Sequence, residues 1–153
     1  MGAIGEAVAR CARAFGMRVL GTQRTPKPSE HADEVLGMDG TERVLAESDY
    51  VVVILPLTPE TRGSLGPALL EKMKPSAVLV NMARGGIVDE AALAEMLRAG
   101  QLRGAVLDVF EEEPLPEASP LWDVPNLVVT PHVAGFSRYV EARLAQALFC
   151  RHV

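Results

Sequence analysis

The 153-residue sequence has little cysteine, few aromatic side chains and no long apolar run. Its two cysteines, Cys11 and Cys150, lie near opposite ends of the chain and match no metal-binding spacing. Both fall in helical patterns, so we expect buried free thiols in a reducing compartment rather than a disulfide. No apolar run approaches the roughly 20 residues of a membrane span, and no secretory signal opens the sequence. These absences predict a cytoplasmic globular chain.

The sequence also has fewer positively charged than negatively charged residues. Fifteen lysines and arginines stand against 20 aspartates and glutamates, which gives a net charge of -5. This balance disfavours nucleic acid and anionic membranes as partners. The length suits one domain with a buried core and is too short for two ordinary domains.

Short apolar segments rich in β-branched residues alternate with segments of helical periodicity. We predict strands at 17–21, 34–36, 50–55, 77–81, 104–108 and 126–130. We predict helices directly after Gly5, at 41–47, 67–73 and 89–98, and from about residue 138 to the end. Asp89 suits a helix N-cap, while Gly16 and Gly100 suit helix ends. This alternation indicates an α/β fold, a doubly wound parallel sheet covered by helices on both faces.

A glycine turn before the first predicted helix supplies half of a dinucleotide-binding motif. The full motif is G-x-G-x-x-G, and Gly2–Gly5 (G-A-I-G) contains only its last two glycines, which an ordinary helix start explains equally well. Gln23 and Arg24 stand where an acidic residue normally meets the ribose hydroxyl. A neutral amide followed by a cation favours NADP(H) over NAD(H), unless Arg24 is only a solvated loop charge.

Three ionisable residues, Arg84, Glu113 and His132, lie beyond the ends of predicted strands. In open α/β sheets, ligands bind at the carboxyl ends of the strands. An arginine can hold a carboxylate with two hydrogen bonds, and a histidine can exchange a proton near neutral pH. A carboxylate beside that histidine favours its charged form and orients its ring. Taken singly, however, each of the three is more often a surface or structural residue.

Several long segments resemble the nucleotide-binding domain of the D-isomer-specific 2-hydroxyacid dehydrogenases, a group that includes glyoxylate/hydroxypyruvate reductases and phosphoglycerate dehydrogenases. These segments are L-P-L-T-P-E-T-R (55–62), M-K-P-S-A-V-L-V-N-M-A-R-G-G-I-V-D-E (73–90), L-D-V-F-E-E-E-P-L-P (107–116), S-P-L-W (119–122) and P-N-L-V-V-T-P-H-V-A-G (125–135). They occur in order and with family-like spacing over essentially the whole chain. The resemblance implies a Rossmann-like oxidoreductase that moves a hydride between NAD(P)H and a small 2-oxo or 2-hydroxy acid. It also implies that the full-length parent is a homodimer.

The resemblance also implies roles for individual residues. Arg84 matches the arginine that grips the substrate, His132 the acid/base histidine, and Glu113 its carboxylate partner. Formate dehydrogenases of similar fold pair their histidine with glutamine, so Glu113 favours hydroxyacid chemistry. The implied cofactor-binding positions are Gly2, Ala3, Ile4, Gly5, Gln23, Arg24, Leu55, Ala83, Arg84, Asp108, His132 and Gly135.

Two parts of the family pattern do not occur in the 153 residues. Members carry a second, substrate-binding domain, and their dinucleotide fold begins with a central strand (order 3-2-1-4-5-6) that would precede Met1. We therefore expect residues 1–153 to form an NAD(P)-binding domain that lacks its first strand and has two unpaired strand edges. Two alternatives stay open, namely a non-catalytic nucleotide-sensing or partner-binding module of the corepressor kind, and an inactive fragment.

Overall fold

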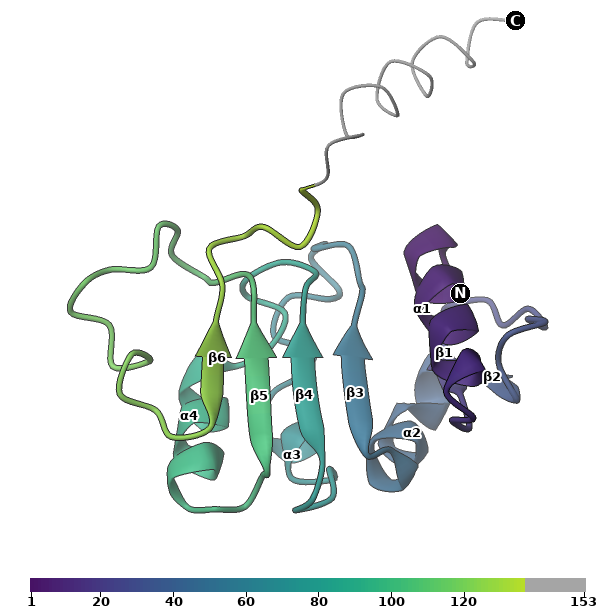
Figure 1. Cartoon of the computed structure of the whole chain (residues 1–153), viewed down its shortest axis with the longest axis horizontal. Coiled ribbons are helices and arrows are strands. Elements are labelled where there is room, and N and C mark those ends of the chain that lie inside the picture. Colours follow the sequence, from purple (N-terminus) through teal and green to yellow (C-terminus); the bar gives the residue numbers. More distant parts are fainter. Residues whose placement is uncertain (137–153) are drawn as a thin grey trace, which may run out of the picture.

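The structure, a computed structural model, describes residues 1–136 and follows the predicted alternation of strands and helices (Figure 1). The helices are α1 (Ala3–Ala14), the 3-10 turn η1 (Met38–Gly40), α2 (Thr41–Glu47), α3 (Pro67–Leu70) and α4 (Glu90–Arg98). The strands are β1 (Leu20–Thr22), β2 (Glu34–Leu36), β3 (Tyr50–Val53), β4 (Val78–Asn81), β5 (Gly104–Leu107) and β6 (Leu127–Val129). The helix predicted from about residue 138 lies outside the described residues.

Capping residues set the helix boundaries as predicted. Asp89 precedes α4, and its side chain accepts a hydrogen bond of 2.9 Å from the backbone N–H of Ala92. This bond satisfies one of the free N–H groups at the start of the helix. Gly16 and Gly100 follow the ends of α1 and α4 with φ of 74° and 66°, values that favour glycine.

Strands β3 to β6 are each one or two residues shorter than predicted, and two other elements differ more. The strand predicted at 17–21 begins only at Leu20, because the backbone N–H of Met17 still donates to the last turn of α1 at 3.1 Å. The helix predicted at 67–73 is a single turn. Its continuation is tighter than an α-helix, since the N–H of Met73 bonds to the carbonyl three residues earlier at 3.0 Å.

The six strands of residues 1–136 all pair in parallel, in two separate sheets. The larger sheet has the order β3-β4-β5-β6, and β1 pairs only with β2. No strand among residues 1–136 lies between β1 and β3, so each of these strands has one unpaired edge. The prediction of a doubly wound parallel sheet without its first strand is therefore confirmed. Parallel pairing places the carboxyl ends of β3 to β6 along one edge, where the connecting loops gather (Figure 1).

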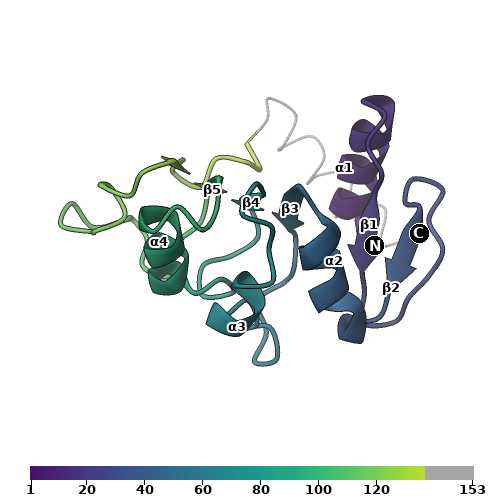
Figure 2. The ribbon, with the colours of Figure 1, turned by 90° about the horizontal axis from the view of Figure 1, so that it is seen from below.

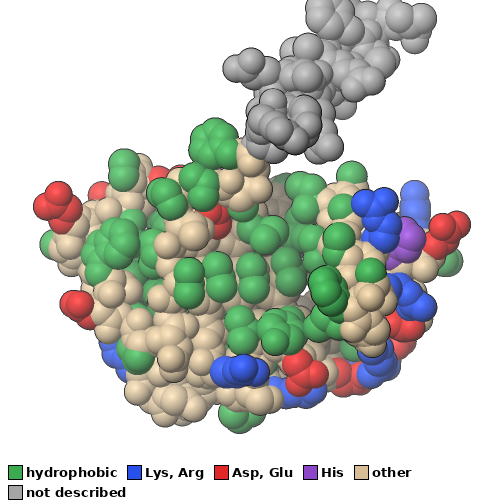
Figure 3. All heavy atoms as spheres, in the orientation of Figure 1, with side chains coloured by type: hydrophobic (Ala, Val, Ile, Leu, Met, Phe, Trp, Pro, Cys, Tyr) green, Lys and Arg blue, Asp and Glu red, His purple; other side chains and the backbone are tan. Residues whose placement is uncertain are grey.

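Helices cover only one face of the four-stranded sheet among the described residues. α3 and α4 lie on the same side (Figure 2), and Leu79 and Leu107 of the sheet are fully buried in the core. The strand register aligns four valines on the opposite face, namely Val52, Val80, Val106 and Val128. Val52 and Val128 are 37% and 55% exposed, and hydrophobic side chains cross this face in Figure 3. Helix α1 lies beside β1 on the side opposite to α3 and α4 (Figure 2), so helices flank both sides of the fold as predicted, although no helix of residues 1–136 covers these valines.

Helix α1 also leaves an apolar surface exposed. Ala9 is buried, whereas Ile4 and Phe15 are 62% and 86% exposed. Cys11 is exposed as well, so the prediction that it is buried is wrong. By its spacing, Cys11 lies on the same face of α1 as Ile4 and Phe15, whereas Ala9 lies on a different face. Cys150 lies outside the described residues.

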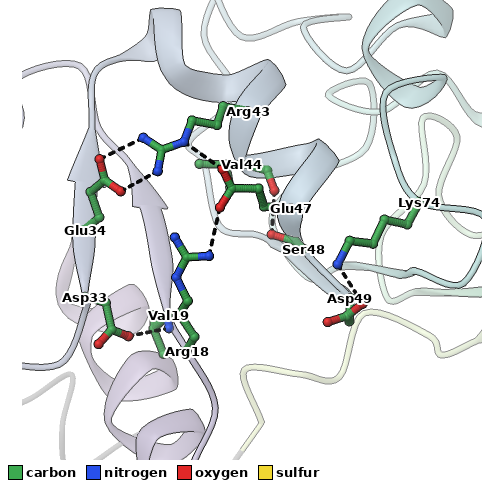
Figure 4. Close-up of polar contacts among 10 residues, drawn as sticks. All are labelled: Arg18, Val19, Asp33, Glu34, Arg43, Val44, Glu47, Ser48, Asp49 and Lys74. Atoms are coloured by element: carbon green, nitrogen blue, oxygen red, sulfur yellow. Dashed lines mark hydrogen bonds and ion pairs between the residues drawn. The ribbon is translucent and has the colours of Figure 1, made fainter.

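Charged hydrogen bonds join the smaller sheet to α2 (Figure 4). Arg43 of α2 donates to both carboxylate oxygens of Glu34 in β2, at 2.9 and 2.8 Å, and to Glu47 at 2.7 Å. Glu47 also accepts a hydrogen bond of 2.8 Å from Arg18, which lies just before β1. Because solvent screens exposed ion pairs, these contacts orient β1 and β2 against α2 more than they stabilise the fold. No helix of the described residues has the length and apolar character needed to cross a bilayer.

Candidate active site

The three ionisable residues predicted from the sequence lie in one open pocket of about 270 Å³. Arg84 follows β4, Glu113 lies in the loop after β5, and His132 follows β6. The remaining lining residues come from the same loops and from the loop after β3; they are Leu57, Arg62, Gly85, Phe110 and Glu111. The parallel sheet therefore brings together three residues that are up to 48 positions apart in the chain (132 − 84).

His132 and Glu113 form a hydrogen-bonded pair. Nδ1 of His132 lies 2.7 Å from Oε2 of Glu113, and Oε1 accepts a hydrogen bond of 2.9 Å from the backbone N–H of Phe110. These two hydrogen bonds hold the pKa of Glu113 below its usual value. An ionised carboxylate only accepts, so the proton of this bond lies on Nδ1. Nε2 of His132 has no hydrogen-bond partner within residues 1–136 and can exchange a proton with a ligand in the pocket.

Asp108, at the end of β5, holds the loop that carries His132. Its Oδ1 accepts hydrogen bonds from the hydroxyl of Thr130 (2.5 Å) and the N–H of Val133 (2.9 Å), and its Oδ2 accepts from the N–H of Ala134 (2.8 Å). Burial raises the pKa of Asp108, but these three hydrogen bonds outweigh it, so the pKa is lowered overall. An ionised Asp108 thereby stabilises the turn in which His132 adopts a φ of 55°.

The loop after β4 presents Arg84 to the pocket. Asn81, 2% exposed, accepts a hydrogen bond of 3.2 Å from the N–H of Ala83 and fixes the start of this loop. Arg84 is exposed, and its Nη1 donates to the carbonyl of Ala83 at 2.6 Å. The guanidinium has five N–H groups, and this is its one hydrogen bond among the described residues. The other N–H groups can therefore bind an anion.

Gly85 brings the arginine loop against the glutamate loop. An alanine Cβ at Gly85 would lie 1.7 Å from the carbonyl oxygen of Phe110, so the two backbones touch. Glu90, the first residue of α4, accepts a hydrogen bond of 2.7 Å from the N–H of Glu111 in the same glutamate loop. Sequence patterns predict no role for Asn81, Gly85 or Glu90 in this site, although the glycine pair directly after Arg84 was a visible signal for Gly85.

The start of α1 lies beside the carboxyl end of β1. The amino group of Met1 donates to Oε1 of Gln23 at 2.9 Å, and the side chain of Met1 packs against Gly21, where a Cβ would lie 2.9 Å from its sulfur. Gln23 and the exposed Arg24 follow β1 directly. Met1, which directly precedes the glycine turn, thus joins the start of α1 to the end of β1.

The remaining predicted residues follow strands of the larger sheet. Leu55 lies two residues beyond β3, Ala83 two residues beyond β4, and Gly135 in the turn after His132. Leu55 is half-buried, Ala83 is 6% exposed, and Gly135 is exposed. No three His, Cys, Asp or Glu side chains within residues 1–136 are grouped as a metal ion would require.

Residues 1–134 match the family described as D-isomer specific 2-hydroxyacid dehydrogenase, NAD binding domain. A curated relative, the glyoxylate/hydroxypyruvate reductase B of Pectobacterium carotovorum, is 48% identical over 137 residues, which cover 88% of this chain and 42% of the relative. The aligned part of this chain covers 46%, 44% and 40% of the length of three other curated relatives. The chain thus spans less than half the length of these curated relatives.

Two solved structures are similar to this chain in both fold and sequence. One is the NADPH-dependent glyoxylate/hydroxypyruvate reductase of Sinorhizobium meliloti in complex with NADP and sulfate, with a TM-score of 0.88 and 39% identity over 99% of this chain and 49% of that one. The other is a D-isomer specific 2-hydroxyacid dehydrogenase from Xanthobacter autotrophicus Py2 in complex with NADPH and MES. It has a TM-score of 0.83 and 44% identity over 95% of this chain and 60% of that one.

Proposed function

The chain belongs to the D-isomer specific 2-hydroxyacid dehydrogenase family and contains its NAD-binding domain, and from this premise we propose an activity for its site. The site serves an NADP(H)-dependent reductase of small 2-oxo acids such as glyoxylate or hydroxypyruvate. The observation that carries this proposal is the His132–Glu113 pair, 2.7 Å apart, in one pocket with Arg84. Relatives named glyoxylate reductase and glycerate dehydrogenase support the substrate class.

Each of the three residues has a separate task in the proposed reaction. Arg84 holds the substrate carboxylate and stabilises the negative charge that develops on the carbonyl oxygen. His132 donates a proton from Nε2 to that oxygen, and returns to the neutral form in the reduction direction. Glu113 keeps Nδ1–H oriented and stabilises the charged imidazole. When bound, the nicotinamide cofactor supplies the hydride.

The residues at the start of α1 fit a dinucleotide. Gly2 has open space around it, so a ligand can approach its backbone, and the first N–H groups of a helix lack partners within the helix. Such N–H groups and the helix dipole favour a phosphate at this position. We assign Gly2, Ala3, Ile4 and Gly5 to the pyrophosphate. Gln23 and Arg24 then flank the adenosine ribose, while Leu55, Ala83, Asp108 and Gly135 line the remainder of the cofactor.

The presence of Arg84, Glu113 and His132 in one pocket favours an enzyme over a nucleotide-sensing module, because sensing alone needs no proton donor. We further propose that the protein works in the cytoplasm as a homodimer on a small 2-oxo or 2-hydroxy acid, without nucleic-acid or membrane partners. The resemblance to the family supports the dimer. The net charge of -5 supports the absence of anionic partners.

The cofactor preference is testable at Arg24. We expect Arg24→Gln to weaken NADPH binding by about 10- to 100-fold, because the 2′-phosphate loses charged hydrogen bonds. NADH has no 2′-phosphate, so its affinity should stay within about twofold of the wild type. The measurement is a fluorescence titration of both dinucleotides with the 153-residue chain. Lys27→Gln, an exposed cation in the same loop, is the matched control.

Equal weakening of NADPH and NADH by Arg24→Gln would refute the assignment of the 2′-phosphate to Arg24. Failure of both dinucleotides to bind the wild type in the millimolar range would favour the inactive fragment. We expect Lys27→Gln to keep the NADPH affinity of the wild type. A loss of affinity in Arg24→Gln alone then reports a specific contact, and not a general loss of positive charge.

A further inference from the structure

A second arginine, Arg62, lines the same pocket as Arg84. The loop that follows it pairs with the loop that follows Arg84. The N–H of Gly63 donates to the carbonyl of Gly86 at 2.7 Å. The N–H of Leu65 donates to the carbonyl of Ile87 at 3.0 Å. These backbone bonds fix the two arginine-bearing segments side by side.

The guanidinium of Arg62 lies directly over Gly86. A Cβ on Gly86 would be 2.9 Å from Nη1 of Arg62, so the absence of a side chain there makes room for the cation. Gly86 is two residues beyond Arg84, which places the cation of Arg62 against the arginine loop itself. The reaction described above gives Arg62 no task.

The ionic partner of Arg62 is weakly held. Its Nη1 lies 3.9 Å from Oε1 of Glu111, and the two side chains are 59% and 72% exposed. Exposed pairs at such a distance contribute little, because water and salt screen them. Glu113, the other acid in the pocket, is already paired with His132. Arg62 can therefore exchange Glu111 for an anionic group of a ligand at small cost.

We propose that Arg62 is an anion-binding residue that selects 2-oxo acids with a second carboxylate, distal to the one held by Arg84. This inference rests on the proposed function, in which Arg84 holds the first carboxylate. A pocket of about 270 Å³ is slightly smaller than the usual range for drug-sized ligands, which suits a small diacid. The chain as a whole carries a net charge of -5 and repels dianions, so local cations must supply the attraction.

Two acids with the same five-carbon chain test this inference. 2-Oxopentanoate has one carboxylate and 2-oxopentanedioate has two, so they differ only in the distal group. We expect the diacid to bind the 153-residue chain about tenfold more tightly at low salt, the effect of one charged hydrogen bond. The affinities come from NMR titrations of the ¹⁵N-labelled chain, which also show whether each variant remains folded.

Arg62→Gln should remove the tenfold advantage of the diacid and leave the affinity for the monoacid unchanged. Arg103→Gln is the matched control, since Arg103 is exposed and does not line the pocket. Three results would overturn the inference: no preference for the diacid in the wild type, a preference that survives Arg62→Gln, or equal weakening of both acids by this variant. None of them affects the role of Arg84. Monoacid binding that is insensitive to Arg84→Gln would instead overturn the proposed function.

Discussion

Replacing Gly85 with alanine should destabilise the chain by at least about 2 kcal/mol and separate Arg84 from Glu113. The new Cβ would lie 1.7 Å from the carbonyl oxygen of Phe110 and 2.0 Å from its carbonyl carbon. Both atoms are backbone, so no flexible side chain can turn away to relieve the overlap. One of the two loops must move, and the pocket between them must change shape.

The free energy of unfolding, from urea denaturation followed by circular dichroism, measures this effect. Gly66→Ala is the matched control, because a Cβ there would make an ordinary contact of 3.4 Å and the backbone is extended. We expect the control to lie within about 0.5 kcal/mol of the wild type. If Gly85→Ala were as stable as the control, the contact between the two loops would not be a requirement of the fold.

Replacing Arg84 with glutamine should weaken the binding of glyoxylate by about 10- to 100-fold. Glutamine removes the charge and the paired N–H groups that hold a carboxylate, and a hydrogen bond to a charged group contributes about 1.5–3 kcal/mol. Since Arg84 is exposed and makes one hydrogen bond to the adjacent residue, its replacement should leave stability nearly unchanged. The fold and the binding effect can therefore be measured separately.

Arg84→Lys distinguishes geometry from charge. Lysine keeps the positive charge but lacks the planar fork, so we expect an affinity between those of the wild type and Arg84→Gln. NMR titration with glyoxylate gives all three affinities. An Arg84→Gln chain that binds glyoxylate within threefold of the wild type would show that another group holds the carboxylate.

Local sequence signals predicted the elements that depend on neighbouring residues. Asp89 precedes the start of α4 and Gly100 follows its end, and both were predictable because helix capping depends on residues within one helical turn. Arg84, Glu113 and His132 were predictable because each follows a strand, and parallel strands end at one edge of a sheet. Their common pocket follows from this rule together with the family motifs.

Contacts between distant loops could not be predicted in the same way. The requirement for glycine at Gly85 depends on Phe110, and the position of Arg62 depends on Gly86. Each pair joins loops separated by 24 or 25 residues (86 − 62 and 110 − 85). No periodicity or spacing specifies such an approach, which arises only when the strands pair in register.

The exposed valine face shows another limit of sequence patterns. Val52 and Val128 belong to β-branched runs typical of strands buried on both sides, yet they are 37% and 55% exposed among the described residues. A β-branched run has the same sequence pattern whether or not a helix covers the strand. The exposure of Cys11 has a similar origin, because the apolar spacing of α1 predicts a buried face without specifying what buries it.

In our proposal, one edge of the sheet binds a nicotinamide dinucleotide and a 2-oxo acid side by side. The most direct test is an NMR titration of the ¹⁵N-labelled chain, first with NADPH and then with glyoxylate. We expect NADPH to shift the backbone amides of Ala3, Ile4 and Arg24 in a saturable manner. Subsequent glyoxylate should shift the side-chain N–H groups of Arg84 and His132. Saturable binding of neither ligand, or shifts confined to residues outside this edge, would contradict the proposal.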